Sequence, residues 1–75
     1  MVGILGYNCK LDRYGLLVMD CWAVQGFCCG TVLDIWDYDS DSWFSARLER
    51  HATGEWYFVG TNFHGDLLEG LKVRF

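Results

Sequence analysis

Residues 43–50 read Trp-Phe-Ser-Ala-Arg-Leu-Glu-Arg and alternate between apolar and polar side chains from Phe44 onward. Phe44, Ala46 and Leu48 fall on one side, and Ser45, Arg47 and Glu49 fall on the other. Successive side chains of a β-strand point to opposite faces, so this stretch predicts a strand with one buried and one solvent-facing side. It is the clearest element in the chain and sets the expected fold class as all-β.

Short β-branched and aromatic runs elsewhere in the chain, separated by glycines, predict further strands of the same kind. The expected strands are Val2–Tyr7, Tyr14–Met19, Thr31–Trp36, Glu55–Val59 and Leu71–Phe75. Together they predict a five- to six-stranded antiparallel SH3-like barrel over residues 1–75, because closing the sheet removes its sticky edges. Residues 20–30 are the least strand-like, with one short helical turn expected over Asp20–Gln25 and an apolar loop after it.

Composition narrows the class of function. The net charge is −4, from six Lys and Arg against ten Asp and Glu. Nucleic-acid binders usually carry the opposite balance, so a basic protein partner is favoured and nucleic acid is not. A second interpretation is that this charge only keeps the domain soluble. No apolar run approaches the ~18 residues of a membrane span and no signal peptide precedes the first strand, which predicts a cytoplasmic protein. We expect a monomer, or a dimer formed through a free strand edge.

Four Trp, four Tyr and five Phe are more rings than a 75-residue domain can bury, so some are expected on the surface. The sharpest cluster spans residues 34–43, where aspartates and aromatic residues alternate. A calcium loop is not expected, because Ser42 replaces its glycine and Leu48 its bidentate glutamate. The cluster predicts a hairpin whose carboxylates imitate phosphates, although a plain solvated turn is the simpler interpretation. The expected partner-binding residues are Asp34, Trp36, Asp37, Tyr38, Asp39, Asp41 and Trp43.

The cysteines allow two interpretations. Cys9, Cys21, Cys28 and Cys29, together with His51 and His64, supply enough ligands for one tetrahedral zinc ion. The favoured set is Cys9, Cys21 and either Cys28 or Cys29, with a histidine as the fourth ligand. Their spacing matches no standard zinc module, so the simpler expectation is four reduced thiols buried in the core.

Catalysis finds no support, because no nucleophile motif or phosphate-binding glycine loop is present, and the chain is expected not to be an enzyme. A basic platform of Arg47, Lys72 and Arg74, with outward aromatics such as Trp56 or Tyr57, is the alternative surface, for a nucleic acid. Ordinary pairing of these cations with neighbouring glutamates is the simpler interpretation.

Several short motifs are similar to those of a family of small proteins from Gram-positive bacteria, phages and mobile elements, catalogued only as a domain of unknown function. The family usually has His before a Cys-Gly pair and an acidic residue after it, where Cys28 and Thr31 stand here. The resemblance implies a mobile-element protein, and many of these inhibit host defence, including anti-CRISPR proteins that target Cas nucleases. The motifs that carry it are Gly6-Tyr7-Asn8-x-Lys10, Arg13-Tyr14-Gly15, Gly26-Phe27-x-Cys29-Gly30, Trp43 with Arg47 and Glu49, Glu55-Trp56-Tyr57 with Val59-Gly60, and Gly70-Leu71-x-Val73-Arg74.

The expected function is therefore that of a non-enzymatic inhibitor with a Cas nuclease as its target. The alternatives are a nucleic-acid-binding barrel and a zinc-stabilised interaction module.

Overall fold

The computed structural model describes all 75 residues and consists of seven strands and one short 3₁₀ helix. Every strand pairing in it is antiparallel. The elements are β1 (Val2–Asn8), β2 (Arg13–Val18), β3 (Cys21–Val24), β4 (Val32–Asp37), β5 (Ser42–Arg50), β6 (Trp56–Phe58), η1 (Gly65–Leu68) and β7 (Lys72–Arg74).

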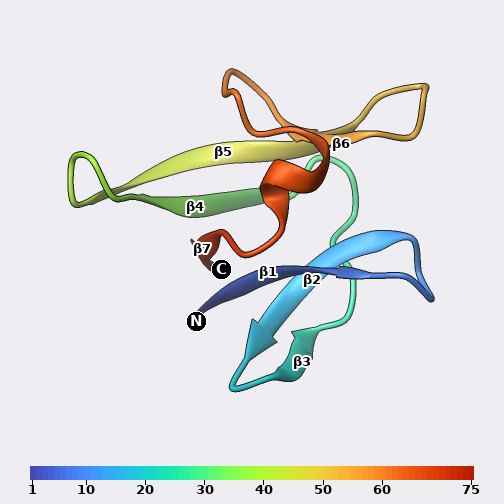
Figure 1. The fold of residues 1–75 in the computed structure, drawn as a ribbon, viewed down its shortest axis with the longest axis horizontal. Helices are drawn as coiled ribbons and strands as arrows, with labels where there is room; N and C mark the ends of the chain where they lie inside the picture. The colour runs from blue at the N-terminus through green and yellow to red at the C-terminus, as the bar shows by residue number, and fades with distance from the viewer.

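The strands form one sheet in the order β3-β2-β1-β7-β4-β5-β6. Figure 1 shows β1, β2 and β3 as one group and β4, β5 and β6 as another, with β7 between them. The predicted all-β class is confirmed. The sheet is not closed, however, because β3 and β6 remain as its two edges, so the expected barrel describes it only loosely.

The helical turn expected over Asp20–Gln25 is wrong, because Cys21–Val24 forms the edge strand β3. Val18 pairs with Cys21, which leaves Met19 and Asp20 as a two-residue loop. Both loop residues have positive φ, 52° and 63°, as a type I′ hairpin turn requires. The usual sequence of that turn is Asn-Gly, so the Met-Asp pair does not predict it.

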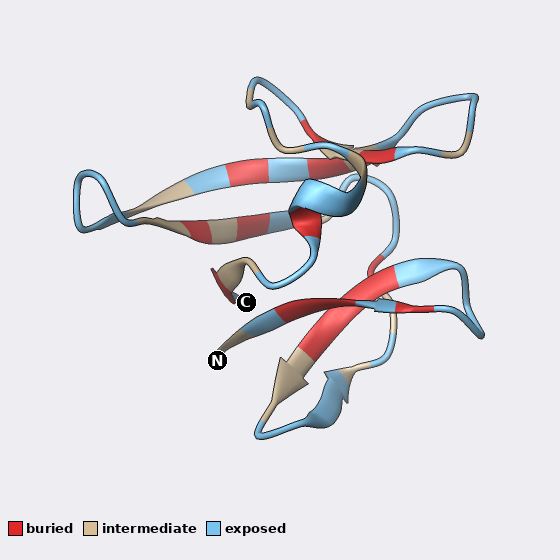
Figure 2. Cartoon of the chain, in the orientation of Figure 1, coloured by how far each residue is buried: buried red, intermediate tan, exposed pale blue.

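The core lies between the two groups of strands. Figure 2 shows buried residues alternating with exposed or half-buried ones along β4 and β5. The alternation predicted for Phe44–Glu49 is confirmed, since Ala46 and Leu48 are buried while Ser45 and Arg47 are exposed. Both groups and η1 contribute to one apolar cluster. Its fully buried members are Leu5, Leu16, Leu33, Ile35, Leu48, Phe58, Leu68 and Val73.

Strand β7 connects the two groups. Val73 pairs with Gly3 of β1 on one side and with Ile35 of β4 on the other. Within β7, Val73 is fully buried and Arg74 is exposed. Paired residues share a face of the sheet, so the solvent-facing side chains of β7 lie beside those of β4 and β5.

The prediction that some aromatic rings lie on the surface is confirmed. Only Tyr14, Phe27, Trp56 and Phe58 are buried, and the other nine rings are at least partly exposed. No helix of the structure is long and apolar enough to cross a membrane.

Candidate functional site

The turn between β4 and β5 carries three of the expected binding aspartates. We call residues 37–41 the acidic turn. Asp37 pairs with Ser42 across the hairpin, and its Oδ1 accepts a hydrogen bond of 2.9 Å from the Asp39 backbone N–H. Asp41 has a φ of 51°, a left-handed conformation that Asp and Asn tolerate better than most residues. Two of the three aspartates thus have a role in the turn itself, and Asp39 has none.

The acidic turn is exposed except at the half-buried Asp37, and its carboxylates have no cation partner. No Lys or Arg forms an ion pair with Asp37, Asp39 or Asp41. The Tyr38 side chain is 72% exposed. A hollow of about 350 Å³ lies at the base of the turn, and it is lined by Trp36, Asp37, Tyr38, Asp39, Phe44, Phe63 and Leu71. The tip therefore presents unneutralised negative charge next to an apolar depression.

Asp34 does not belong with these free carboxylates. Arg74 donates to its Oδ2 from Nε at 2.9 Å and from Nη2 at 2.7 Å, and the Ser45 hydroxyl donates to its Oδ1 at 2.7 Å. The hydrogen bond from Ser45, together with those from Arg74 and its charge, lowers the pKa of Asp34 below its usual value. Asp34 is therefore a structural carboxylate, already neutralised within the sheet.

The two expected tryptophans lie on the solvent face of the sheet with the cations of β7. The Trp36 and Trp43 rings pack edge to face, with centroids 5.2 Å apart. Lys72 Nζ lies 4.9 Å from the Trp36 centroid, and Arg74 Cζ lies 4.5 Å from the Trp43 centroid. Such contacts stabilise both partners, because the face of an aromatic ring attracts cations. Two cations of the predicted basic platform therefore contact two rings that were predicted for the acidic surface.

The basic platform expected for nucleic acid is only partly available. Arg47 Nε pairs with Glu49 at 2.9 Å, as the simpler interpretation expected. Arg74 is held by Asp34 and not by the expected glutamate. Lys72 is the one member without a carboxylate partner. Trp56, expected as an outward aromatic, is instead 4% exposed, because β6 turns its Trp56 and Phe58 rings into the core.

The structure does not assemble the expected zinc set. Cys9 lies in the β1–β2 turn, Cys21 begins β3, and Cys28 and Cys29 lie in the loop before β4. No three His, Cys, Asp or Glu side chains are placed to hold a metal ion. The alternative of buried core thiols is wrong as well, because all four cysteines are free and exposed. A metal ion on these thiols would require the loops that carry them to move.

The two histidines lie at exposed positions near the β5–β6 hairpin. The His51 ring stacks on Tyr57, with centroids 3.9 Å apart and an interplanar angle of 12°. His64 Nδ1 lies 3.6 Å from Glu55 Oε1.

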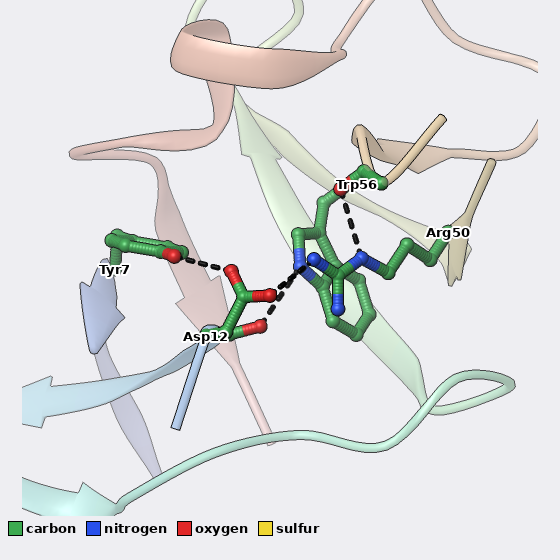
Figure 3. A network of polar contacts seen from close by, with 5 residues as sticks. Tyr7, Asp12, Arg50 and Trp56 are labelled. Atoms are coloured by element: carbon green, nitrogen blue, oxygen red, sulfur yellow. Dashed lines mark hydrogen bonds and ion pairs between the residues drawn. The ribbon is translucent and has the colours of Figure 1, made fainter. Parts of the chain in front are cut away.

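A polar network that the sequence did not predict ties the β1–β2 turn to the β5–β6 hairpin. Figure 3 shows Tyr7, Asp12, Arg50 and Trp56 converging on one another. The Tyr7 hydroxyl and Arg50 Nη2 each donate to the Asp12 carboxylate. Trp56 Nε1 donates to the Asp12 backbone carbonyl at 3.3 Å, and Arg50 Cζ lies 5.0 Å from the Trp56 ring centroid. No local pattern signals this network, because it joins Asp12 to Arg50 and Trp56, which lie 38 and 44 positions further along the chain.

The same network shifts two ionisation equilibria. The hydrogen bond from Tyr7, followed by that from Arg50, lowers the pKa of Asp12. The bond to Asp12, with some desolvation, raises the pKa of Tyr7. Both shifts favour the pairing of an ionised Asp12 with a protonated Tyr7.

Comparison with known proteins gives one match. The family model described as a domain of unknown function, DUF5348, matches residues 3–75. No curated protein and no solved structure matches the chain. Because the match covers nearly the whole fold described above, the chain belongs to the DUF5348 family of domains of unknown function.

Proposed function

We propose that this chain is a non-enzymatic binding protein from a mobile element, which acts as a stoichiometric inhibitor of a nucleic-acid-handling host-defence protein. A Cas nuclease is the target we propose. The observation that supports this most is the acidic turn, where Asp37, Asp39 and Asp41 have no cation partner although the chain's cations pair elsewhere with Asp12, Asp34 and Glu49.

The geometry of the turn suits a basic groove. Its three carboxylates lie within five consecutive residues at the tip of a hairpin, where they can meet Lys and Arg side chains that otherwise hold phosphates. Tyr38 and the hollow beside it supply apolar area next to that charge. Aromatic side chains are typical anchors of protein interfaces, and the charged residues beside them can pair with opposite charges on the partner.

The test uses the triple variant D37N/D39N/D41N. Asn accepts the same backbone hydrogen bond as Asp37 and tolerates the same positive φ as Asp41, so the variant removes charge while keeping the turn. We expect it to bind a guide-loaded Cas nuclease at least about tenfold more weakly than the unmodified chain, and with a shallower dependence on salt.

The matched control is Y38A, which removes the exposed ring and keeps all three charges. It should weaken binding without changing the salt dependence. Equal affinity of the triple variant and the unmodified chain, measured by calorimetry in low salt, would remove the acidic turn from the interface. Failure of the unmodified chain to bind or inhibit any Cas nuclease would reject the proposed target.

A second candidate function is supported by the cation–π contacts of Lys72 and Arg74 with Trp36 and Trp43. A single-stranded nucleic acid would stack bases on these rings and place phosphates at the cations. Fluorescence anisotropy with a labelled oligonucleotide at low salt distinguishes the candidates. Binding that disappears in K72A favours this one, and the absence of binding excludes it.

A further inference from the structure

The largest hollow of the molecule lies away from both surfaces discussed above. It has a volume of about 520 Å³, within the range of ligand pockets. Three separate segments line this open hollow, namely the β1–β2 hairpin, the β5–β6 hairpin and the stretch from η1 to Glu69. Its aromatic and acidic lining residues are Tyr7, Tyr14, Trp56, Glu55, Asp66 and Glu69. We call it the carboxylate pocket.

The carboxylate pocket has a strong excess of negative charge. None of its lining residues is basic, and no Lys or Arg forms an ion pair with Glu55, Asp66 or Glu69. The His64 ring contacts Glu55 from outside the pocket lining, at 3.6 Å. Glu69 accepts a hydrogen bond of 2.8 Å from the Tyr7 backbone N–H, which leaves its second oxygen without a partner. The Asp66 carboxylate accepts no hydrogen bond, and only the backbone carbonyl of this residue does, from the Glu69 N–H at 3.2 Å. The pocket therefore offers hydrogen-bond acceptors with no donor assigned to them.

The negative charges of these carboxylates influence the ionisation of Tyr14, which also lines the pocket. Burial and then the charges of Glu69 and Asp66 raise the pKa of the Tyr14 hydroxyl, which donates to the Gly65 carbonyl at 3.2 Å. Burial disfavours a charge of either sign, but the negative charges of Glu69 and Asp66, which disfavour a tyrosinate anion, attract a cation.

The rim of the pocket already holds a guanidinium group by this chemistry. Arg50 lies over the ring of Trp56, pairs with the Asp12 carboxylate, and donates from Nε to the Gly54 carbonyl at 2.8 Å. Trp56 and Gly54 both line the pocket. One aromatic ring, a carboxylate and a carbonyl thus bind one arginine here. The pocket offers the exposed Tyr7 ring and the carboxylates of Glu55, Asp66 and Glu69 without an arginine of its own.

We propose that the carboxylate pocket binds the side chain of an arginine from a partner protein. A guanidinium fits better than an ammonium, because it stacks on an aromatic face while its fork of N–H groups binds carboxylates in its plane. A quaternary ammonium has no N–H for Asp66 or Glu69 to accept. The source of the arginine rests on the proposed function, in which the partner is a basic protein.

The experiment measures the pocket without any partner. The protein labelled with ¹⁵N is titrated with N-acetyl-arginine amide and, separately, with its neutral isostere N-acetyl-citrulline amide. We expect the arginine probe to shift the resonances of Asp66, Glu69 and the Trp56 indole with a Kd of about 1 mM, a value typical of a ligand this small. The citrulline probe should bind at least about tenfold more weakly, because the attraction depends on charge.

Two double variants then locate the site. D66N/E69Q removes two charges from the pocket and should weaken the arginine probe about tenfold or more. D39N/D41N removes the same number of charges from the acidic turn and should leave the affinity within about twofold. Equal binding of the two probes, equal binding by D66N/E69Q, or no shift at the pocket would each overturn the proposal. The first and last outcomes need only the unmodified protein, so a folding defect in a variant does not decide the result.

The two proposals fail separately. If D37N/D39N/D41N binds a Cas nuclease as tightly as the unmodified chain while the arginine probe still binds the pocket, the role of the acidic turn is lost and the pocket remains. If the probe does not bind but the triple variant loses its partner, the reverse holds.

Discussion

The β1–β2 and β4–β5 turns are built alike and used differently. Each has a four-residue loop, and each opens on a residue whose side chain accepts from the backbone two positions on, Asn8 in one and Asp37 in the other. Each also has an aspartate at its fourth loop position, with a φ of 53° at Asp12 and 51° at Asp41. Backbone geometry therefore accounts for an aspartate at both positions equally.

The difference lies in what surrounds the carboxylate. Tyr7 and Arg50 hold Asp12, whereas no hydroxyl or cation reaches Asp41. An acidic residue in a turn is thus no evidence of function by itself, and its pairing separates a structural carboxylate from an available one. Asp34 belongs with Asp12 by this criterion, because Arg74 neutralises its charge and the Ser45 hydroxyl donates a hydrogen bond to it.

The largest expected effect on stability comes from removing Trp56, which supports the β1–β2 turn. Trp56 is 4% exposed and joins the core to Asp12 through its indole N–H. Trp56→Ala should lower the free energy of unfolding by about 3–5 kcal/mol, the usual range for removing a buried Trp. Urea denaturation followed by circular dichroism measures this. Trp43→Ala, which removes a half-buried ring from the solvent face, is the control and should cost clearly less.

A smaller effect compares the two fourth-position aspartates directly. The folded-state pKa of Asp12 is lowered, so its contribution to stability is present above the unfolded value of about 3.9 and is lost as the pH falls through the folded value. D12N should therefore destabilise the protein at pH 7 and flatten the loss of stability between about pH 5 and pH 2.

Thermal melting of D12N and the unmodified chain across this pH range is the measurement. The lowered pKa of Asp34 contributes in the same direction, so some acid sensitivity should remain in D12N and fall further in D12N/D34N. If the melting temperature of the double variant fell with decreasing pH as steeply as that of the unmodified chain, neither carboxylate would form these interactions in solution.

The smallest effect is expected at Asp41. D41N keeps a residue that tolerates positive φ and loses no hydrogen bond, so its stability should stay within about 0.5 kcal/mol of the unmodified chain. D41A should cost about 1 kcal/mol, because alanine is strained in that conformation. If D41N instead destabilised the protein as much as D12N, the distinction between the two turns would be lost. Chemical denaturation at neutral pH resolves these differences.

Much of the fold could be read from side-chain alternation, and much of the site could not. The pattern in Phe44–Glu49 determines which face of β5 is buried, because one face meets the core. The hairpin at Met19 and Asp20 escaped prediction because non-glycine residues there adopt positive φ, which their identities do not announce. The acidic turn lies within one local stretch, so sequence reasoning could find it.

The partners of Asp34 and the carboxylate pocket depend instead on register and on distant segments. Arg74 reaches Asp34 only because β7 pairs with β4, and the sequence did not give that strand order. Tyr7, Trp56 and Glu69 meet in the pocket from three separate elements. The motifs that carry the family resemblance include Gly15, where an added Cβ would lie 2.3 Å from the Val24 carbonyl oxygen. That residue is explained by close strand packing and gives no indication of function.

The position of β7 has a consequence for how the chain folds. Strands β1 to β3 and strands β4 to β6 each pair with their neighbours in sequence, and only β7 joins the two groups. On the ribosome, each group can therefore form its local hairpins early, but the sheet stays in two pieces until residues 72–74 emerge. We expect the cooperative folding step to be late and to depend on three residues, so that their side chains influence the folding rate more than those of any other strand of equal length.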